Sequence, residues 1–271
     1  MVAFQSTKIL AMKEPLYRAE IKTIGCVLQL RINDIPVFNS NGLAELQSVV
    51  TLNTYLSTDE NDLRAFLSPP APHSNMADAV AVFKCSITVQ DMAVAMEARE
   101  VVTIANLEFD VTQDQRVYPQ IIETQFQVPT PFPEWTWLRA PRFRLDDTLV
   151  QEALDLTRRI WNTMSTRNID AFLDAQPTRI RELASALYMP ATEVSNEIRT
   201  DMAGLLSTAS LALQPLDTVQ LDFNLYADDR LIRPYDRRGY EPLRLEGPDR
   251  LVSEVPLYMT RGLGGRLIWI R

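Results

Sequence analysis

Histidine and cysteine, which often transfer protons or bind metal ions in proteins, are rare in this sequence. The single histidine, His73, follows Pro72, and the two cysteines, Cys26 and Cys85, lie far apart in the chain. A Ser-His-Asp or Cys-His site would have to use His73, and zinc sites place cysteines or histidines at short spacings. We therefore expect an exposed loop histidine, two reduced and buried cysteines, and neither a metal nor an organic cofactor.

Two short segments carry residues typical of ion sites, but each lacks part of the pattern. Residues 262–265 (Gly-Leu-Gly-Gly) could hold an anion, yet no helix pattern follows them, so a hairpin turn is favoured. The oxygen-rich segment from Asp59 to Asp62 lacks the central glycine of an EF-hand, and Pro70 stands at the twelfth position. We expect a solvated turn there and leave open a calcium site of another kind.

Two groups of arginine and aromatic residues are candidates for a binding surface. Their members are Trp135, Trp137, Arg139, Arg142, Arg230, Arg233 and Arg237. Tryptophan, tyrosine and arginine are enriched in interface hot spots, so these residues could form a face that binds a partner. Two other interpretations stay open: the arginines are solvated surface charge, or the tryptophans and Tyr118 cover a seam between domains.

Acidic residues offer weaker candidates for catalysis. Asp222 and Tyr226 are four positions apart, so a strand would place them on the same face. Asp228 and Asp229 fit the tip of a hairpin better than a glycosidase pair, because such carboxylates must face each other across a cleft.

Composition and charge exclude several classes of protein. The chain has 271 residues, of which 46% are hydrophobic and 23% charged, with a formal net charge of −8. These values are typical of a globular protein and exclude a mainly disordered or collagen-like chain. The acidic net charge argues against a long nucleic-acid-binding face, which must be basic, but does not exclude a local basic patch. The chain carries neither an 18-residue apolar run nor a signal-peptide pattern in residues 1–16, so we expect a cytoplasmic protein without membrane insertion.

Residues 1–130 predict an antiparallel β-sandwich. Runs of alternating or apolar residues, notably at 17–30, 80–89, 101–111 and 121–128, predict about seven strands separated by turns. The alternation changes phase at Gly25, which predicts a β-bulge within one long strand. Asn33 and Asp34 predict the turn of a hairpin.

The second half predicts a domain of another kind. Residues 131–145, rich in proline and tryptophan, predict a connector. From Asp146 onward the apolar residues recur with a helical period, which predicts one helix face made of Leu149, Ala153, Leu156, Ile160 and Met164. Gly- or Asp-containing turns later separate short strands. Residues 146–271 therefore predict an α+β domain with helices over 146–207 and an antiparallel β-meander over 218–271, which places the whole chain in the α+β class.

Three resemblances add to this interpretation. Residues 30–38 (Leu-Arg-Ile-Asn-Asp-Ile-Pro-Val-Phe), 52–56 (Leu-Asn-Thr-Tyr-Leu) and 61–63 (Asn-Asp-Leu) resemble a pattern of jelly-roll sandwiches, such as the sugar-binding-like domains attached to glycosidases. This resemblance implies that the asparagines are structural, although Asp59 and Glu60 replace the family's usual glycine. The element order of the second half, with residues 228–233 (Asp-Asp-Arg-Leu-Ile-Arg), resembles the ketosteroid-isomerase-like α+β cone. The two-part arrangement is similar to two-domain bacterial proteins, some of which act as immunity or accessory partners of secreted toxins.

These observations favour a non-enzymatic protein-binding protein, such as an immunity or accessory protein that masks a toxin or effector. An acidic protein would associate faster with a basic partner through electrostatic steering. The first alternative is a carbohydrate- or small-ligand-binding module in which Trp135 or Trp137 stacks on a sugar ring. The second is an enzyme whose pocket in the cone-like half uses Asp222 and Tyr226. The oligomeric state stays open.

Overall fold

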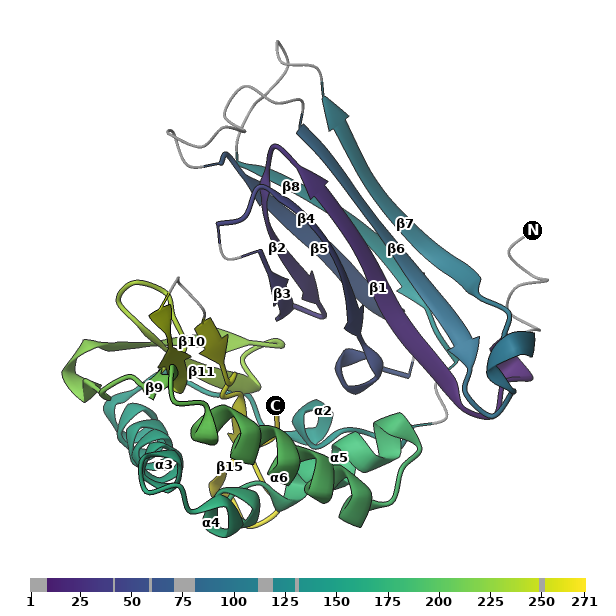
Figure 1. Ribbon diagram of the computed structural model, residues 1–271. Coiled ribbons are helices and arrows are strands. Elements are labelled where there is room, and N and C mark those ends of the chain that lie inside the picture. Colours follow the sequence, from purple (N-terminus) through teal and green to yellow (C-terminus); the bar gives the residue numbers. More distant parts are fainter. Residues whose placement is uncertain are drawn as a thin grey trace. The chain divides into compact units, whose positions relative to one another are not determined.

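The chain divides into two compact units, residues 1–133 and 134–271, which are described separately. The computed structural model describes residues 9–40, 42–58, 60–70, 81–111, 119–129, 132–248 and 252–271 (Figure 1). Residues 134–145, for which the sequence predicts a connector, belong to the C-terminal unit and contain the short helix α2 (Thr136–Arg139).

The N-terminal unit is an antiparallel sandwich of two four-stranded sheets. Its strands are β1 (Pro15–Ile24), β2 (Val27–Ile32), β3 (Ile35–Asn39), β4 (Glu45–Thr51), β5 (Glu60–Ser68), β6 (Ala81–Asp91), β7 (Val102–Val111) and β8 (Gln120–Gln127). One sheet has the order β4-β1-β6-β7 and the other β3-β2-β5-β8. The sandwich expected from the sequence is confirmed.

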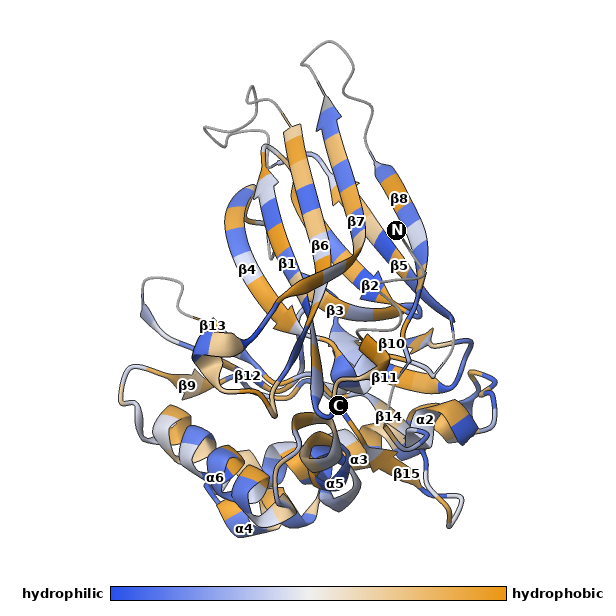
Figure 2. Ribbon diagram, turned by 90° about the vertical axis from the view of Figure 1, so that its right-hand side faces the viewer, coloured by the Kyte–Doolittle hydropathy of each residue, from blue (hydrophilic) through white to orange (hydrophobic). Residues whose placement is uncertain are grey.

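Alternating side chains build the core of this unit. Figure 2 shows hydrophobic and hydrophilic residues alternating along β6 and β7. In β6, Phe83, Cys85 and Ile87 are buried, whereas Lys84 between them is exposed. Successive side chains of a strand point to opposite faces, so one face of each sheet enters the core.

The expected β-bulge at Gly25 is wrong. β1 ends at Ile24 in the first sheet, and β2 begins at Val27 in the second. Gly25 has a φ of 66°, a left-handed conformation that glycine adopts without steric cost. The change of phase therefore marks the point at which the chain crosses from one sheet to the other.

Asparagine side chains connect the loops of the sandwich to its strands. The Asn33 side chain donates to Tyr55 O at 2.9 Å and to Asn61 Oδ1 at 2.8 Å. The Asn53 side chain accepts from Tyr17 N at 2.8 Å and donates to Pro15 O at 3.1 Å. Asn33 and Asp34 both have positive φ between β2 and β3, as the two-residue turn expected from the sequence requires.

The C-terminal unit begins with α2, a short helix that the sequence did not predict within the connector. The next helices lie within the predicted range of 146–207. They are α3 (Asp147–Ser165), α4 (Ile169–Asp174), α5 (Pro177–Leu187) and α6 (Ala191–Ser207). The side chain of Asp146 caps α3 by accepting from Leu149 N at 2.9 Å. The buried stripe of α3 consists of Leu149, Ala153, Leu156, Thr157, Ile160 and Met164, so the periodicity identified the correct face.

Short antiparallel strands complete this unit. They are β9 (Ala212–Leu213), β10 (Leu221–Tyr226), β11 (Leu231–Asp236), β12 (Arg244–Glu246), β13 (Val252–Glu254), β14 (Met259–Arg261) and β15 (Leu267–Trp269). The sheet order β10-β11-β14-β15 follows the chain, but β12 and β13 form a second sheet with β9. The apolar core lies between these strands and the helices, where Ile160 and Phe172 cluster with Trp269.

Candidate functional site

The turn after β11 is organised by one carboxylate. Asp236 Oδ1 accepts from Arg238 N at 2.8 Å and Tyr240 N at 3.0 Å, and its Oδ2 accepts from Arg238 Nε at 3.0 Å and Nη2 at 2.9 Å. Gly239 occupies a positive φ of 84° within this turn. Burial opposes ionisation of Asp236, but these hydrogen bonds outweigh burial and lower the pKa of the carboxyl. The carboxylate thereby fixes both the backbone and the side chain of Arg238.

Tyr240 lies against two guanidinium groups. Arg244 Cζ is 4.1 Å and Arg238 Cζ 5.3 Å from the centre of its ring. The ring is 40% exposed, so it presents a surface to solvent while its neighbours restrict it. This is the geometry of cation–π attraction, which limits the movement of all three side chains.

A second arginine is buried in the strand beside this turn. Arg233 of β11 pairs with Glu241 and donates to the hydroxyl of Tyr258. Its guanidinium also lies over the rings of Tyr235 and Tyr258, at 4.7 Å and 4.3 Å. A buried ion pair of this kind is costly to separate, because the remaining charge has no water around it.

Arg244 connects the turn to the second sheet. Its side chain pairs with Glu246 at 2.5 Å and lies 4.0 Å from Asp236 Oδ2. Glu254, paired in register with Arg244, accepts from Glu241 N at 3.2 Å. Burial raises the pKa of Glu254, and the positive charges of Arg244 and Arg233 counteract this only in part. Arg244 is thus surrounded by the carboxyl groups of Asp236, Glu246 and Glu254.

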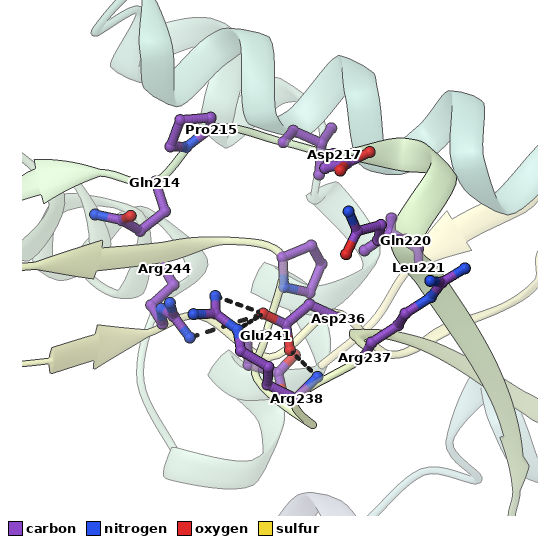
Figure 3. Close-up of a pocket in the computed structure, with 12 residues that line it drawn as sticks. Gln214, Pro215, Asp217, Gln220, Leu221, Asp236, Arg237, Arg238, Glu241 and Arg244 are labelled. Atoms are coloured by element: carbon purple, nitrogen blue, oxygen red, sulfur yellow. Dashed lines mark hydrogen bonds and ion pairs between the residues drawn. The ribbon is translucent and has the colours of Figure 1, made fainter.

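A pocket opens beside these charged side chains (Figure 3). It has a volume of about 240 Å³ and lies wholly within the C-terminal unit. In Figure 3 the segment of Gln214, Pro215 and Asp217 runs above the pocket, and Arg238 and Arg244 lie below it. Its lining consists of Gln214, Pro215, Leu216, Asp217, Gln220, Leu221, Asp236, Arg237, Arg238, Glu241, Pro242 and Arg244.

The arginines predicted as a binding surface have different environments. Arg139 is exposed and pairs with Glu134, and Arg142 is exposed and pairs with Asp228. Arg233 is buried, Arg230 is half-buried, and Arg237 is exposed at the pocket. Of this group, the structure places only Arg237 among the residues that line the pocket.

The two predicted tryptophans lie inside the structure rather than on an exposed face. Trp135 and Trp137 are both buried, and the helix α2 that follows Trp135 packs against β14. Thr136 N, between them, donates to Glu182 Oε1 at 2.7 Å. Tyr118, with which a seam was expected, lies outside the described residues.

Sequence reasoning missed Tyr240, Glu241 and Arg244 as members of a site. The spacing of Asp236, Arg238 and Tyr240 is the signal that could have found the turn, because an aspartate side chain often accepts from backbone N–H groups two and four residues later. No sequence pattern connects this turn to Gln214 and Gln220, which only the tertiary fold brings to the same pocket.

Other residues that the sequence singled out for ion binding or catalysis lie outside the pocket, in turns or on strand β10. Residues 262–265 form the turn between β14 and β15, with Gly262 N donating to Arg266 O at 2.9 Å. Asp228 and Asp229 lie in the turn between β10 and β11 with positive φ. Asp222 is exposed whereas Tyr226 is buried, and neither lines the pocket.

The cysteines are buried and free, and burial raises the pKa of the Cys85 thiol to about 12. His73 and Asp59 lie outside the described residues. Within the described ranges, no three His, Cys, Asp or Glu side chains are grouped so as to hold a metal ion. Over the same part of the chain, no helix combines the length and apolar character needed to cross a bilayer.

Comparison with known proteins identifies no family for this chain. Family models, curated proteins and solved structures were each searched, and none matches. The fold defines the class, which is an α+β protein with a β-sandwich unit.

Proposed function

We propose that this chain is a protein-binding protein and that residues 237–240 form part of its contact surface. The observation that carries the proposal is the set of four hydrogen bonds by which Asp236 holds Arg238 and Tyr240. Both side chains are exposed, with 67% of Arg238 and 40% of Tyr240 open to solvent.

Restrained exposed residues favour binding for an energetic reason. Immobilising a flexible side chain at an interface costs about 0.5–1.5 kcal/mol. The Asp236 hydrogen bonds and the ring contacts already restrict Arg238 and Tyr240. Tyrosine and arginine also dominate the small number of interface residues that contribute most to affinity.

The turn favours acidic groups on the partner. Arg237 presents an exposed guanidinium group, which suits a bidentate hydrogen bond with a carboxylate, and Arg238 adds a second exposed positive charge although its Nε and Nη2 already bind Asp236. The net charge of −8 acts over longer distances and favours the approach of a partner that is basic overall. A partner that is basic overall but carries a carboxylate at the contact would satisfy both conditions. More narrowly, we propose that the partner is a toxin or effector that this chain masks.

Capture from the native host tests the proposal. We would compare the wild-type chain, the double variant Arg238→Ala/Tyr240→Ala, and the control Arg181→Ala, which removes an exposed arginine from α5. We expect a stoichiometric protein partner that the control retains and the double variant binds about thirtyfold more weakly, as loss of a hot spot of about 2 kcal/mol predicts. Absence of a stoichiometric partner, or equal binding by all three chains, would contradict the proposal.

A further inference from the structure

We propose that the pocket beside Arg244 binds a small neutral molecule rich in hydroxyl groups, of the sugar or polyol class. The proposal concerns the cavity and goes beyond the protein-binding surface formed by the exposed turn. The cavity volume of about 240 Å³ corresponds to about eight water molecules at ~30 Å³ each. It lies just below the roughly 300–1,000 Å³ of pockets for drug-sized ligands, which fits a ligand of one ring.

Two residues that line the pocket have buried polar atoms without hydrogen-bond partners within the described chain. These atoms are Nε and Nη1 of Arg244, which are donors, and Oε2 of Glu241, which is an acceptor. Both side chains line the pocket and are almost fully buried, with 3% of Arg244 and 4% of Glu241 exposed. An unsatisfied buried polar group costs roughly 1–3 kcal/mol, so the pocket favours an occupant that both accepts from Arg244 and donates to Glu241.

The charges around the pocket favour a neutral occupant. Its lining contains three arginines and three acidic residues, namely Arg237, Arg238, Arg244, Asp217, Asp236 and Glu241. Arg244 is already paired with Glu246, and Glu241 with Arg233. An anion at Arg244 would approach the carboxylate of Glu241, and a cation at Glu241 would approach Arg244.

Hydroxyl groups fit this arrangement because each one both donates and accepts a hydrogen bond. A ligand with several hydroxyl groups can therefore offer an acceptor to Arg244 and a donor to Glu241 at the same time. Gln214 and Gln220 add amide groups that can bind further hydroxyls. Pro215, Leu221 and Pro242 supply apolar surface for the C–H groups of a sugar or cyclitol ring.

Ligand-observed NMR tests the inference directly. Saturation-transfer difference spectra of the full chain would be recorded with glucose, galactose, myo-inositol and glycerol, and with acetate, methyl phosphate and glycine as charged probes. We expect saturation transfer to at least one neutral polyol and none to the charged probes. Titration would then give the dissociation constant of that polyol.

Two variants locate the binding to the pocket. Gln220→Trp fills the opening from an exposed position, and we expect it to raise the dissociation constant at least tenfold. Glu241→Gln removes the carboxylate acceptor and should also weaken binding, but it breaks a buried ion pair, so its folding must be verified by thermal denaturation. Gln127→Trp places the same indole at the exposed end of β8 and should bind as the wild type does.

The inference would be overturned by any of three results. None of the four polyols shows saturation transfer, in which case water alone occupies the pocket. Acetate or methyl phosphate binds and the polyols do not, in which case the pocket is an anion site. The Gln220→Trp and Gln127→Trp variants bind a polyol equally well, in which case the ligand lies elsewhere. None of these results depends on whether residues 237–240 capture a protein partner.

Discussion

The two units bury polar side chains of different kinds. The N-terminal sandwich buries neutral groups, among them Ser40, Asn53 and Asn61. The C-terminal unit buries arginines and glutamates, and every charged residue that is buried in the described part of the chain belongs to it. These charged residues are Glu182, Arg233, Glu241, Arg244 and Arg271.

Buried neutral side chains stabilise the fold, whereas buried charged side chains can also leave hydrogen-bonding groups for a ligand. An asparagine amide both donates and accepts, so Asn53 satisfies two backbone groups at once. A guanidinium has five N–H donors and rarely finds acceptors for all of them in a small unit. The open donors of Arg244 beside the cavity are the result.

Removal of one charge from the buried Arg233–Glu241 pair is the largest expected effect. The variant Arg233→Met leaves Glu241 buried without its cation and should lower the free energy of unfolding by about 3–5 kcal/mol. All four tryptophans lie at positions 135, 137, 161 and 269, so tryptophan fluorescence during urea denaturation follows the C-terminal unit. The double variant Arg233→Met/Glu241→Leu should recover most of the loss, and a double variant as unstable as the single one would contradict the role of the unpaired charge.

Removal of one buried asparagine side chain from the sandwich should lower the free energy of unfolding by less than Arg233→Met does. Asn53→Ala leaves the N–H of Tyr17 buried without its acceptor and should lower the free energy of unfolding of the N-terminal unit by about 2 kcal/mol. Both cysteines lie in this unit and are buried, so the urea dependence of thiol labelling reports its unfolding. Asn106→Ala, at an exposed position of β7, is the matched control and should change little. Equal effects of the two substitutions would show that burial of the Asn53 amide is unimportant.

The pH dependence of stability should distinguish two carboxyl groups of the C-terminal unit. The pKa of Asp236 is lowered in the folded state, so its carboxylate stabilises the fold above the usual value of 3.8, and this stability is lost as the pH falls through the lowered pKa. Asp236→Asn should therefore be less stable than the wild type at about pH 7, and the difference should shrink at about pH 3. The raised pKa of Glu254 predicts the opposite sign for Glu254→Gln. Urea denaturation at both pH values, followed by tryptophan fluorescence, measures both effects.

An exposed ion pair of the sandwich is expected to have the smallest effect. Lys84 and Glu108 are exposed on neighbouring strands, with Nζ and Oε2 3.9 Å apart. Lys84→Ala should change the free energy of unfolding by no more than about 0.5 kcal/mol, because water already screens the pair. A loss as large as that of Arg233→Met would remove the contrast between buried and exposed charge.

Local patterns predicted much of the fold. The helical period over α3 placed Leu149, Ile160 and Met164 on the buried face, as the structure confirms. The asparagines at 33, 53 and 61 contact the backbone of neighbouring segments, as expected for structural residues. The resemblance to jelly-roll sandwiches, from which that expectation came, stays a prediction.

The candidate site was predicted less well, because burial of arginine leaves no local signal. Arg233 and Arg237 are of the same residue type and only four positions apart, yet Arg233 is buried beside Tyr258 and Arg237 is exposed. The tryptophans at 135 and 137 are hydrophobic enough for either a core or a surface, and the structure places both inside.

Alternation, helical period and turn residues depend on neighbours within a few positions, so the amino-acid order by itself determined the class of each unit and the positions of most elements. Sheet partners depend on contacts between distant segments, so only the tertiary structure decided that Gly25 carries the chain between sheets and that β9 joins β12. The same holds for the pocket, where residues 214–221 meet the charged cluster of residues 236–244. Desolvation is the physical reason, since the chemistry of Arg244 and Glu241 depends on how completely the surrounding fold excludes water from them.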